Sequence, residues 1–192
     1  MENVEGIYPL GPMQEAILLQ ELGAGAAGGY VEQVGWTIRG PFAPDAFSRA
    51  WERAVGRHPA LRSAFFWEGM DAPVQVVRRR AEIRAEALDW RGVDPREQEA
   101  RLAGLRGAHR REGFDLSAAP LLRLAWVRTG EEEHRFLWSY HHLVLDGWSV
   151  TLLLREVLAT YDAGCRGEEP PEEPVPPLTA YHAWLRGRSP AE

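Results

Sequence analysis

The stretch from residue 135 to residue 161 changes its hydrophobic period within a few positions. Residues 135–142 alternate in the manner of a strand, and one face of that strand would carry Phe136, Trp138, Tyr140 and His142. After Ser149, a candidate N-cap, apolar side chains recur at helical spacing up to a candidate stop at Gly164; they are Val150, Leu153, Leu154, Val157, Leu158 and Tyr161. A strand joined directly to an amphipathic helix predicts helices packed on a sheet.

Strand and helix patterns interleave along the rest of the sequence without strict alternation. Further strands are predicted at residues 30–39, 61–67, 73–77, 83–90 and 121–128. Helices are predicted at residues 13–22, with an apolar side of Met13, Ala16, Ile17 and Leu18, and at 44–57 and 95–111. A small-residue loop at 23–29, a Pro- and Glu-rich surface loop at 165–177 and a short segment at 181–185 complete the prediction. This order favours the α/β class as an α+β sandwich, with a mixed, mainly antiparallel sheet and helices packed on it.

Composition excludes several function classes. A net charge of -6 gives no support to nucleic-acid binding, so no nucleic-acid partner is expected. No apolar run approaches the ~20 residues of a membrane-spanning helix, and the first residues lack the features of a signal peptide, so no membrane partner and a cytoplasmic location are expected. The single cysteine, Cys165, excludes an intramolecular disulfide and lies in the charged loop, where a catalytic role is not favoured.

Two adjacent histidines, His141 and His142, end the strand that precedes the long helix. Successive strand residues point to opposite faces, so only one of them can serve as a working base, while the other is packed and hydrogen-bonded. The same geometry argues against a metal held by the pair, and no metal site is expected. Ser149 lacks the surroundings of a nucleophilic serine, and helix capping is sufficient to explain it.

Asp146 and Gly147 follow the histidines in a short turn. A carboxylate at this position could organise the loop, and a glycine leaves room for a substrate or a neighbouring backbone. The alternative is two core histidines before an ordinary Asp-Gly turn. Because the turn, the glycine and the helix cap follow in register, the whole pattern favours a functional site.

Several motifs together resemble the condensation domain of nonribosomal peptide synthetases. Residues 8–15 (YPLGPMQE) resemble the opening signature of that family, and residues 57–65 (RHPALRSAF) resemble its arginine-histidine motif. Residues 141–147 (HHLVLDG) match its active-site motif, and residues 113–116 and 119–123 are also typical. The stretch 178–181 keeps only the final tyrosine, Tyr181, of a Tyr-x-Asp-Tyr segment. Residues 66–69 and 137–142 are similar to the corresponding segments of domains that accept a donor ending in a D-residue.

The resemblance implies a chloramphenicol acetyltransferase-like lobe in which His142 is catalytic. The second histidine would position or deprotonate an acceptor amine that attacks a thioester. His141, Asp146, Gly147 and Arg62 would support the site, Asp146 through an ion pair with Arg62. No cofactor would bind directly, because the substrates arrive on the phosphopantetheine arms of upstream donor and downstream acceptor carrier-protein domains.

Family members have two lobes, and residues 1–192 resemble only the amino-terminal one. We therefore expect the carboxy-terminal lobe to be a missing partner, the isolated lobe to be inactive, and an exposed lobe interface to cause self-association. Two alternatives stay open. One is a non-catalytic half-domain that docks carrier proteins, and the other is a complete acetyltransferase-like subunit with its site between identical chains.

Overall fold

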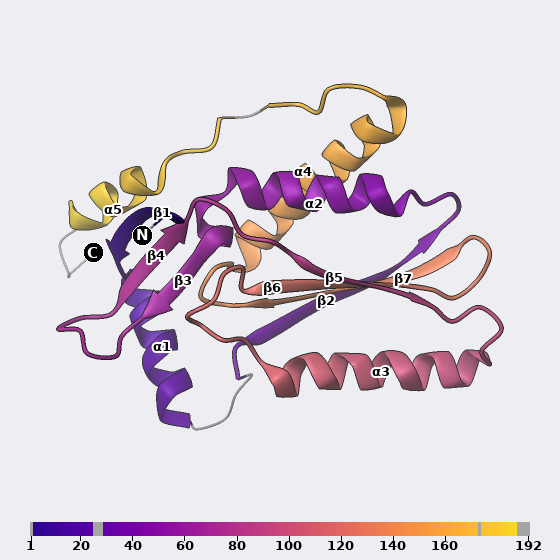
Figure 1. Cartoon of the computed structure of the whole chain (residues 1–192), viewed down its shortest axis with the longest axis horizontal. Coiled ribbons are helices and arrows are strands. Elements are labelled where there is room, and N and C mark those ends of the chain that lie inside the picture. Colours follow the sequence, from indigo (N-terminus) through magenta and orange to yellow (C-terminus); the bar gives the residue numbers. More distant parts are fainter. Residues whose placement is uncertain (1, 25–28, 173, 188–192) are drawn as a thin grey trace.

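Two β-sheets organise the computed structural model, which describes residues 2–24, 29–172 and 174–187 (Figure 1). The larger sheet has the strand order β2 (Val31–Arg39), β7 (Glu133–His141), β6 (Leu122–Arg128) and β5 (Arg84–Asp89). Its pairs are antiparallel except β5 with β6, which is parallel. The predicted mixed, mainly antiparallel arrangement is thus confirmed, although it is divided between two sheets.

Helices cover both faces of the larger sheet (Figure 1). On one face lies α3 (Pro95–Glu112), the crossover that a parallel pair such as β5 and β6 requires. On the other face lie α2 (Pro44–Arg57) and α4 (Gly147–Arg166). The site loop therefore leaves a strand that is covered by helices on both sides.

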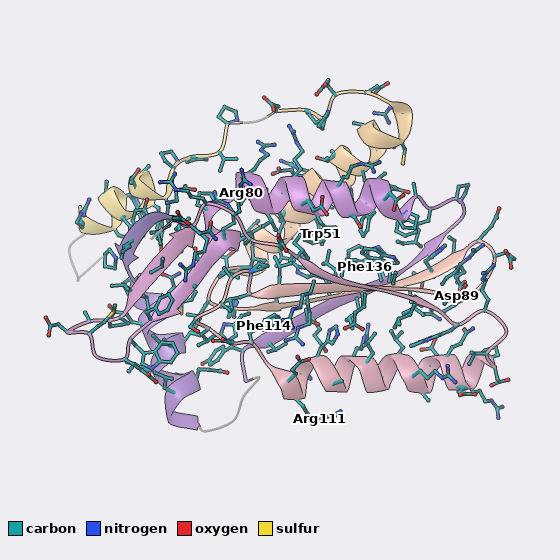
Figure 2. The ribbon with its side chains drawn as sticks, in the orientation of Figure 1. Trp51, Arg80, Asp89, Arg111, Phe114 and Phe136 are labelled. Atoms are coloured by element: carbon teal, nitrogen blue, oxygen red, sulfur yellow. The ribbon has the colours of Figure 1, made fainter. Side chains whose placement is uncertain are left out.

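Aromatic side chains form the core between α2 and the larger sheet. Trp51 of α2 is fully buried, with its ring centroid 4.8 Å from Trp138 and 6.1 Å from Phe136 of β7 (Figure 2). Because Phe136, Trp138 and Tyr140 alternate along β7, all three join this core, as their period predicts. Packing of this face fixes the register of β7 and hence the position of His141 and His142 at its end.

The smaller sheet has the order β1 (Val4–Pro9), β4 (Val74–Arg78) and β3 (Ser63–Phe66). The chain passes from β1 into α1 (Pro12–Ala24), and a 3₁₀ turn, η1 (Pro59–Arg62), leads into β3. The last helix, α5 (Leu178–Arg186), lies against β1, where the rings of His182 and Tyr8 stack 5.0 Å apart. The sequence prediction missed β1 and placed the start of β3 two residues early.

Several details of the helices differ from the prediction. The N-cap of α4 is Asp146, whose carboxylate accepts from the Ser149 amide at 2.8 Å, so Ser149 is not the cap. The same helix ends at Gly167, which adopts the left-handed φ of 70° that glycine tolerates, and not at Gly164. The loop expected at 165–177 therefore begins after Arg166, and its residue 173 lies outside the described residues.

Helix α1 has a narrower buried side than predicted. Ile17 and Leu18 are buried, whereas Met13 and Ala16 are exposed. Residues 25–28 of the loop expected at 23–29 lie outside the described residues. Among the helices that the structure describes, none combines the length and the apolar character needed to cross a membrane.

Candidate active site

The candidate site is the turn that connects β7 to α4. His141 is the last residue of β7, and His142 is the first residue beyond it. The amide of His142 donates to the carbonyl of Tyr30 at 3.0 Å, and the amide of Val144 donates to the carbonyl of His141 at 3.2 Å. These bonds hold the turn against the start of β2, so both histidines have defined positions.

The side chain of His141 is buried within the turn. It is 1% exposed, and its Nδ1 accepts from the amide of Leu143 at 3.2 Å. The rings of Phe114 and Tyr30 surround it, each with a centroid 6.3 Å away. Burial, and secondly the neighbouring His142, lower the pKa of His141 from 6.5 to about 4. The ring is therefore neutral at pH 7 and stabilises the turn as an acceptor.

The side chain of His142 is half-buried and makes a hydrogen bond within the turn. Its Nδ1 lies 2.7 Å from the carbonyl oxygen of Leu145. Because a carbonyl oxygen only accepts, Nδ1 must carry the proton, and the neutral ring keeps its lone pair on Nε2. An imidazole held in one tautomer by a backbone carbonyl has the properties of a general base.

Asp146 and Gly147 begin α4. The backbone amide of Ser149, more than any other group, lowers the pKa of the Asp146 carboxyl, and the charge of His142 acts in the same direction. Asp146 is therefore ionised and caps the helix. A Cβ built on Gly147 would meet no protein atom within 4 Å among the described residues, so no neighbouring side chain or backbone requires glycine there.

Arg62 is the last residue of η1, directly before β3, and it does not pair with Asp146. It is 5% exposed, and its guanidinium donates to the carbonyl of Val55 at 3.1 Å, to Glu5 Oε2 at 2.7 Å and to the carbonyl of Arg78. The ion pair expected between Arg62 and Asp146 is therefore wrong. The guanidinium is occupied where α2, β1 and β4 meet, and the carboxylate serves the first amides of α4.

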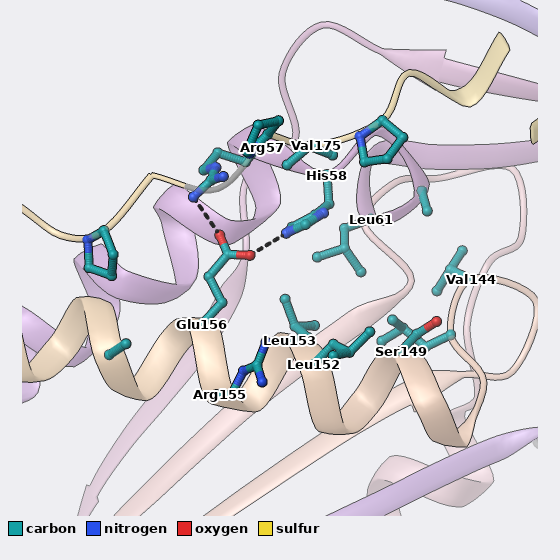
Figure 3. A pocket seen from close by; sticks show the side chains of 16 residues that line it. Arg57, His58, Leu61, Val144, Ser149, Leu152, Leu153, Arg155, Glu156 and Val175 are labelled. Carbon is teal, nitrogen blue, oxygen red and sulfur yellow. Dashed lines mark hydrogen bonds and ion pairs between the residues drawn. The ribbon is translucent and has the colours of Figure 1, made fainter. Parts of the chain in front are cut away.

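A cavity of about 340 Å³ adjoins the same turn (Figure 3). Leu145 lines it together with Leu61 and Leu153, but His142 is not among its lining residues. Glu156 of α4 lies at one wall and forms ion pairs with His58 Nε2 at 2.7 Å and Arg57 Nη1 at 3.0 Å. The cavity therefore lies between the turn, α2, α4 and loop residues such as Val175, and His142 is not part of its wall.

Sequence reasoning missed two residues that contact the cavity or the turn. One is Glu156, whose place on the buried side of α4 was hidden because glutamate does not contribute to an apolar pattern. The other is Gln14, whose side-chain amide donates to the carbonyl of Leu143 at 3.1 Å. A signal for it exists, since a glutamine three residues into a helix often caps that helix. Within the described ranges, no three His, Cys, Asp or Glu side chains are placed to hold a metal ion.

The sequence of this chain matches known proteins. The family model of the condensation domain matches residues 4–192. A linear gramicidin synthase polypeptide of Brevibacillus parabrevis is 37% identical over 184 residues, which cover 96% of this chain and 2% of that protein. Chondramide synthase cmdD of Chondromyces crocatus is 43% identical over 160 residues, which cover 82% of this chain and 4% of that protein.

Solved structures agree on the fold. The starter condensation domain of rhizomide synthetase RzmA superposes with a TM-score of 0.81 at 23% identity and covers 95% of this chain and 45% of its own. The first condensation domain of the CDA synthetase gives a TM-score of 0.82 at 20% identity, with 97% and 47% coverage. This chain thus spans less than half of each solved domain, and the expected chloramphenicol acetyltransferase-like fold is confirmed. The chain belongs to the condensation-domain family of nonribosomal peptide synthetases.

Proposed function

We propose that this chain is the amino-terminal lobe of a condensation domain and supplies His142 to amide-bond formation. The observation that carries the proposal is the hydrogen bond from His142 Nδ1 to the carbonyl of Leu145, which leaves Nε2 free as a base. The substrates are an acyl or peptidyl thioester on an upstream carrier protein and an aminoacyl group on a downstream one. Both are attached through phosphopantetheine arms, and this chain binds no cofactor of its own.

In the proposed reaction the acceptor amine attacks the thioester carbonyl. A C–N bond forms, the C–S bond breaks, and the proton lost by the amine passes to His142 Nε2. The imidazolium then gives that proton to the departing thiolate, so the products are an amide and a free phosphopantetheine thiol. The carbonyl of Leu145 stabilises the transient imidazolium because it accepts from Nδ1, and the Asp146 carboxylate adds a favourable longer-range interaction.

The second substrate wall comes from a carboxy-terminal lobe in this proposal. Two observations support it: His142 is half-exposed, and the described residues around Gly147 leave open space. Holding two tethered substrates within reacting distance supplies much of a bimolecular rate enhancement, and one lobe provides only one wall. The 192-residue chain alone is therefore expected to show little or no condensation activity.

The test uses the chain within a two-lobe domain, with donor and acceptor carrier proteins loaded in advance. Intact-protein mass spectrometry would follow transfer of the acyl group to the acceptor carrier protein. We expect product with the wild-type domain, a loss of at least about 100-fold with H142A, and near wild-type product with H182A, a buried histidine stacked on Tyr8 outside the site. Unchanged product with H142A would reject the catalytic role and favour a docking half-domain.

The same preparation separates the acetyltransferase-like alternative. The isolated chain would be incubated with an acyl coenzyme A and a free amine, and its mass in solution would be measured. A stable trimer that acylates the amine would favour a complete subunit with its site between identical chains. An inactive chain would support the two-lobe proposal.

A further inference from the structure

The side-chain amide of Gln14 bonds directly to the turn that carries His142. Its Nε2 donates to the carbonyl of Leu143 at 3.1 Å, although the two residues lie 129 positions apart in the sequence. Leu143 is the residue after His142 and two residues before Leu145, whose carbonyl holds the histidine ring. Gln14, which belongs to α1, therefore links the backbone of this turn to an element other than β7 and α4.

The start of α1 fixes the orientation of this amide. Gln14 Oε1 accepts from the amide of Gly11 at 3.0 Å, which satisfies one of the free N–H groups at the start of the helix. With the oxygen so used, both hydrogens of the NH₂ group must point away from the cap. They reach the carbonyl of Leu143 and, at 3.3 Å, Oε1 of Gln75.

The hydrogen bonds continue from Gln14 into the smaller sheet, and at each step the residue that accepts one bond donates the next. Gln75 Nε2 donates to Ser63 Oγ at 2.7 Å, and the Ser63 hydroxyl donates to the carbonyl of Pro59 at 3.0 Å. Gln75 is 2% exposed and Ser63 is fully buried, so water does not compete for these bonds. The network therefore favours one orientation of the Gln14 side-chain amide.

We propose that Gln14 is a positioning residue for His142. It anchors the carbonyl of Leu143, so the turn keeps the geometry in which the carbonyl of Leu145 accepts from His142 Nδ1. Without that anchor, the turn is less restricted, and the ring divides between its two tautomers. Only the tautomer with a free Nε2 can act as the base, so the population of competent sites falls.

The decisive variant is Q14E. A glutamate keeps the length of glutamine and still accepts from the Gly11 amide, but it cannot donate to Leu143 and places negative charge beside two oxygens. Q14M, which is unbranched and uncharged, removes the same bonds without that repulsion. Q98E is the matched control, because Gln98 Nε2 likewise donates to two carbonyls, of Trp90 and Thr129, each at 3.0 Å.

The measurement is the ¹⁵N NMR spectrum of the histidine rings in the 192-residue chain, with His142 assigned by its own substitution. Wild type and Q98E are expected to show the Nδ1-protonated form of His142, and Q14E and Q14M a mixture of both tautomers. Exchange of the Val144 amide is expected to quicken about fivefold, the effect of losing roughly one net hydrogen bond. Fold would be checked from the spectrum of the remaining amides.

An unchanged His142 tautomer in a folded Q14E or Q14M chain would overturn the inference. So would loss of the native fold in both variants, because Gln14 would then serve folding and not this turn in particular. The importance of the inference rests on the proposed function, but its readout does not. A tautomer shift in a domain that shows no condensation would leave the positioning role standing and reject only the function.

Discussion

His142 Nδ1 lies 2.7 Å from the carbonyl oxygen of Leu145, three residues later in the same turn. This contact determines the tautomer of the ring and places the free lone pair on Nε2. Asp146, the nearest carboxylate in the sequence pattern, instead caps α4 through the Ser149 amide. The orienting group for the proposed base is therefore a backbone carbonyl, and the carboxylate has a structural role.

Arg62 and Asp146 should contribute to stability independently. D146A is expected to cost about 1 kcal/mol of unfolding free energy through the lost helix cap. R62M is expected to cost on the order of 3 kcal/mol, since it removes a buried guanidinium from Glu5 and two carbonyls. Urea unfolding of both single variants and of the double variant should give effects that add within about 0.5 kcal/mol. A coupling energy above roughly 1 kcal/mol between the two substitutions would contradict their independence and indicate an ion pair between Arg62 and Asp146.

Stability should fall as the pH drops from 6.5 towards 4. In the unfolded chain His141 takes up a proton near its ordinary pKa of 6.5, whereas burial lowers its folded-state pKa to about 4. Between these values the unfolded state binds more protons, so acid favours unfolding by up to roughly 3 kcal/mol from this residue. Burial lowers the pKa of His109, His134 and His182 as well, which acts in the same direction.

The contribution of His141 can be isolated with H141N. An asparagine oxygen can accept from the Leu143 amide as Nδ1 does, but it does not titrate. Urea unfolding at pH 7 and pH 4.5 is expected to show a smaller loss of stability in H141N than in wild type. An equal loss in both proteins would count against the buried, neutral state of His141.

Glu156 should stabilise the junction of α2 and α4. Its side chain is 22% exposed and its carboxylate contacts Arg57 and His58, so E156A is expected to cost about 1–3 kcal/mol. Glu172 forms a comparable pair with Arg53 at 2.8 Å but is 79% exposed, and E172A should cost less than about 1 kcal/mol. Thermal unfolding of the two variants provides the comparison, and an equal cost would contradict the account.

The N-terminal half of α4 should promote association of the isolated chain. Trp148 is 81% exposed and Leu152 is 57% exposed, an apolar pair next to the proposed site. Sedimentation velocity over a range of concentrations is expected to show association of the wild-type chain and less of it for W148S/L152S. A wild-type chain that stays monomeric at high concentration would argue that this face needs no covering lobe.

Periodic patterns predicted most of the fold. Helices α2, α3 and α4 and the strands β2, β6 and β7 lie close to their predicted positions, because their apolar side chains recur at a helical or strand period. Strand β1 was missed because its apolar and polar residues do not alternate: Ile7 is on the exposed side and Gly6 is on the half-buried side. The α4 cap was placed three residues late because Ser149 and Asp146 are both good N-cap residues.

The residues of the candidate site were proposed from the sequence, whereas most of their contacts could not be predicted from it. Strand alternation predicted that one of the two histidines would be packed, but not which one; the family resemblance selected His142 as the base. In the structure His141 is buried and His142 is half-exposed. The partners of Arg62 and Gln14 could not be predicted, since they depend on how the two sheets and α1 pack together. Backbone carbonyls such as that of Leu145 exist at every residue, so no sequence pattern indicates which of them orients the ring.

The most direct test compares the adjacent histidines in single-turnover condensation by a two-lobe domain with loaded carrier proteins. H142N should lower the rate on the order of 100- to 10,000-fold, because it removes the proposed base. H141N should retain a rate within about tenfold of wild type, since its oxygen can replace the Nδ1 acceptor. Loss of rate in H141N with little change in H142N would contradict the assignment of His142 as the base.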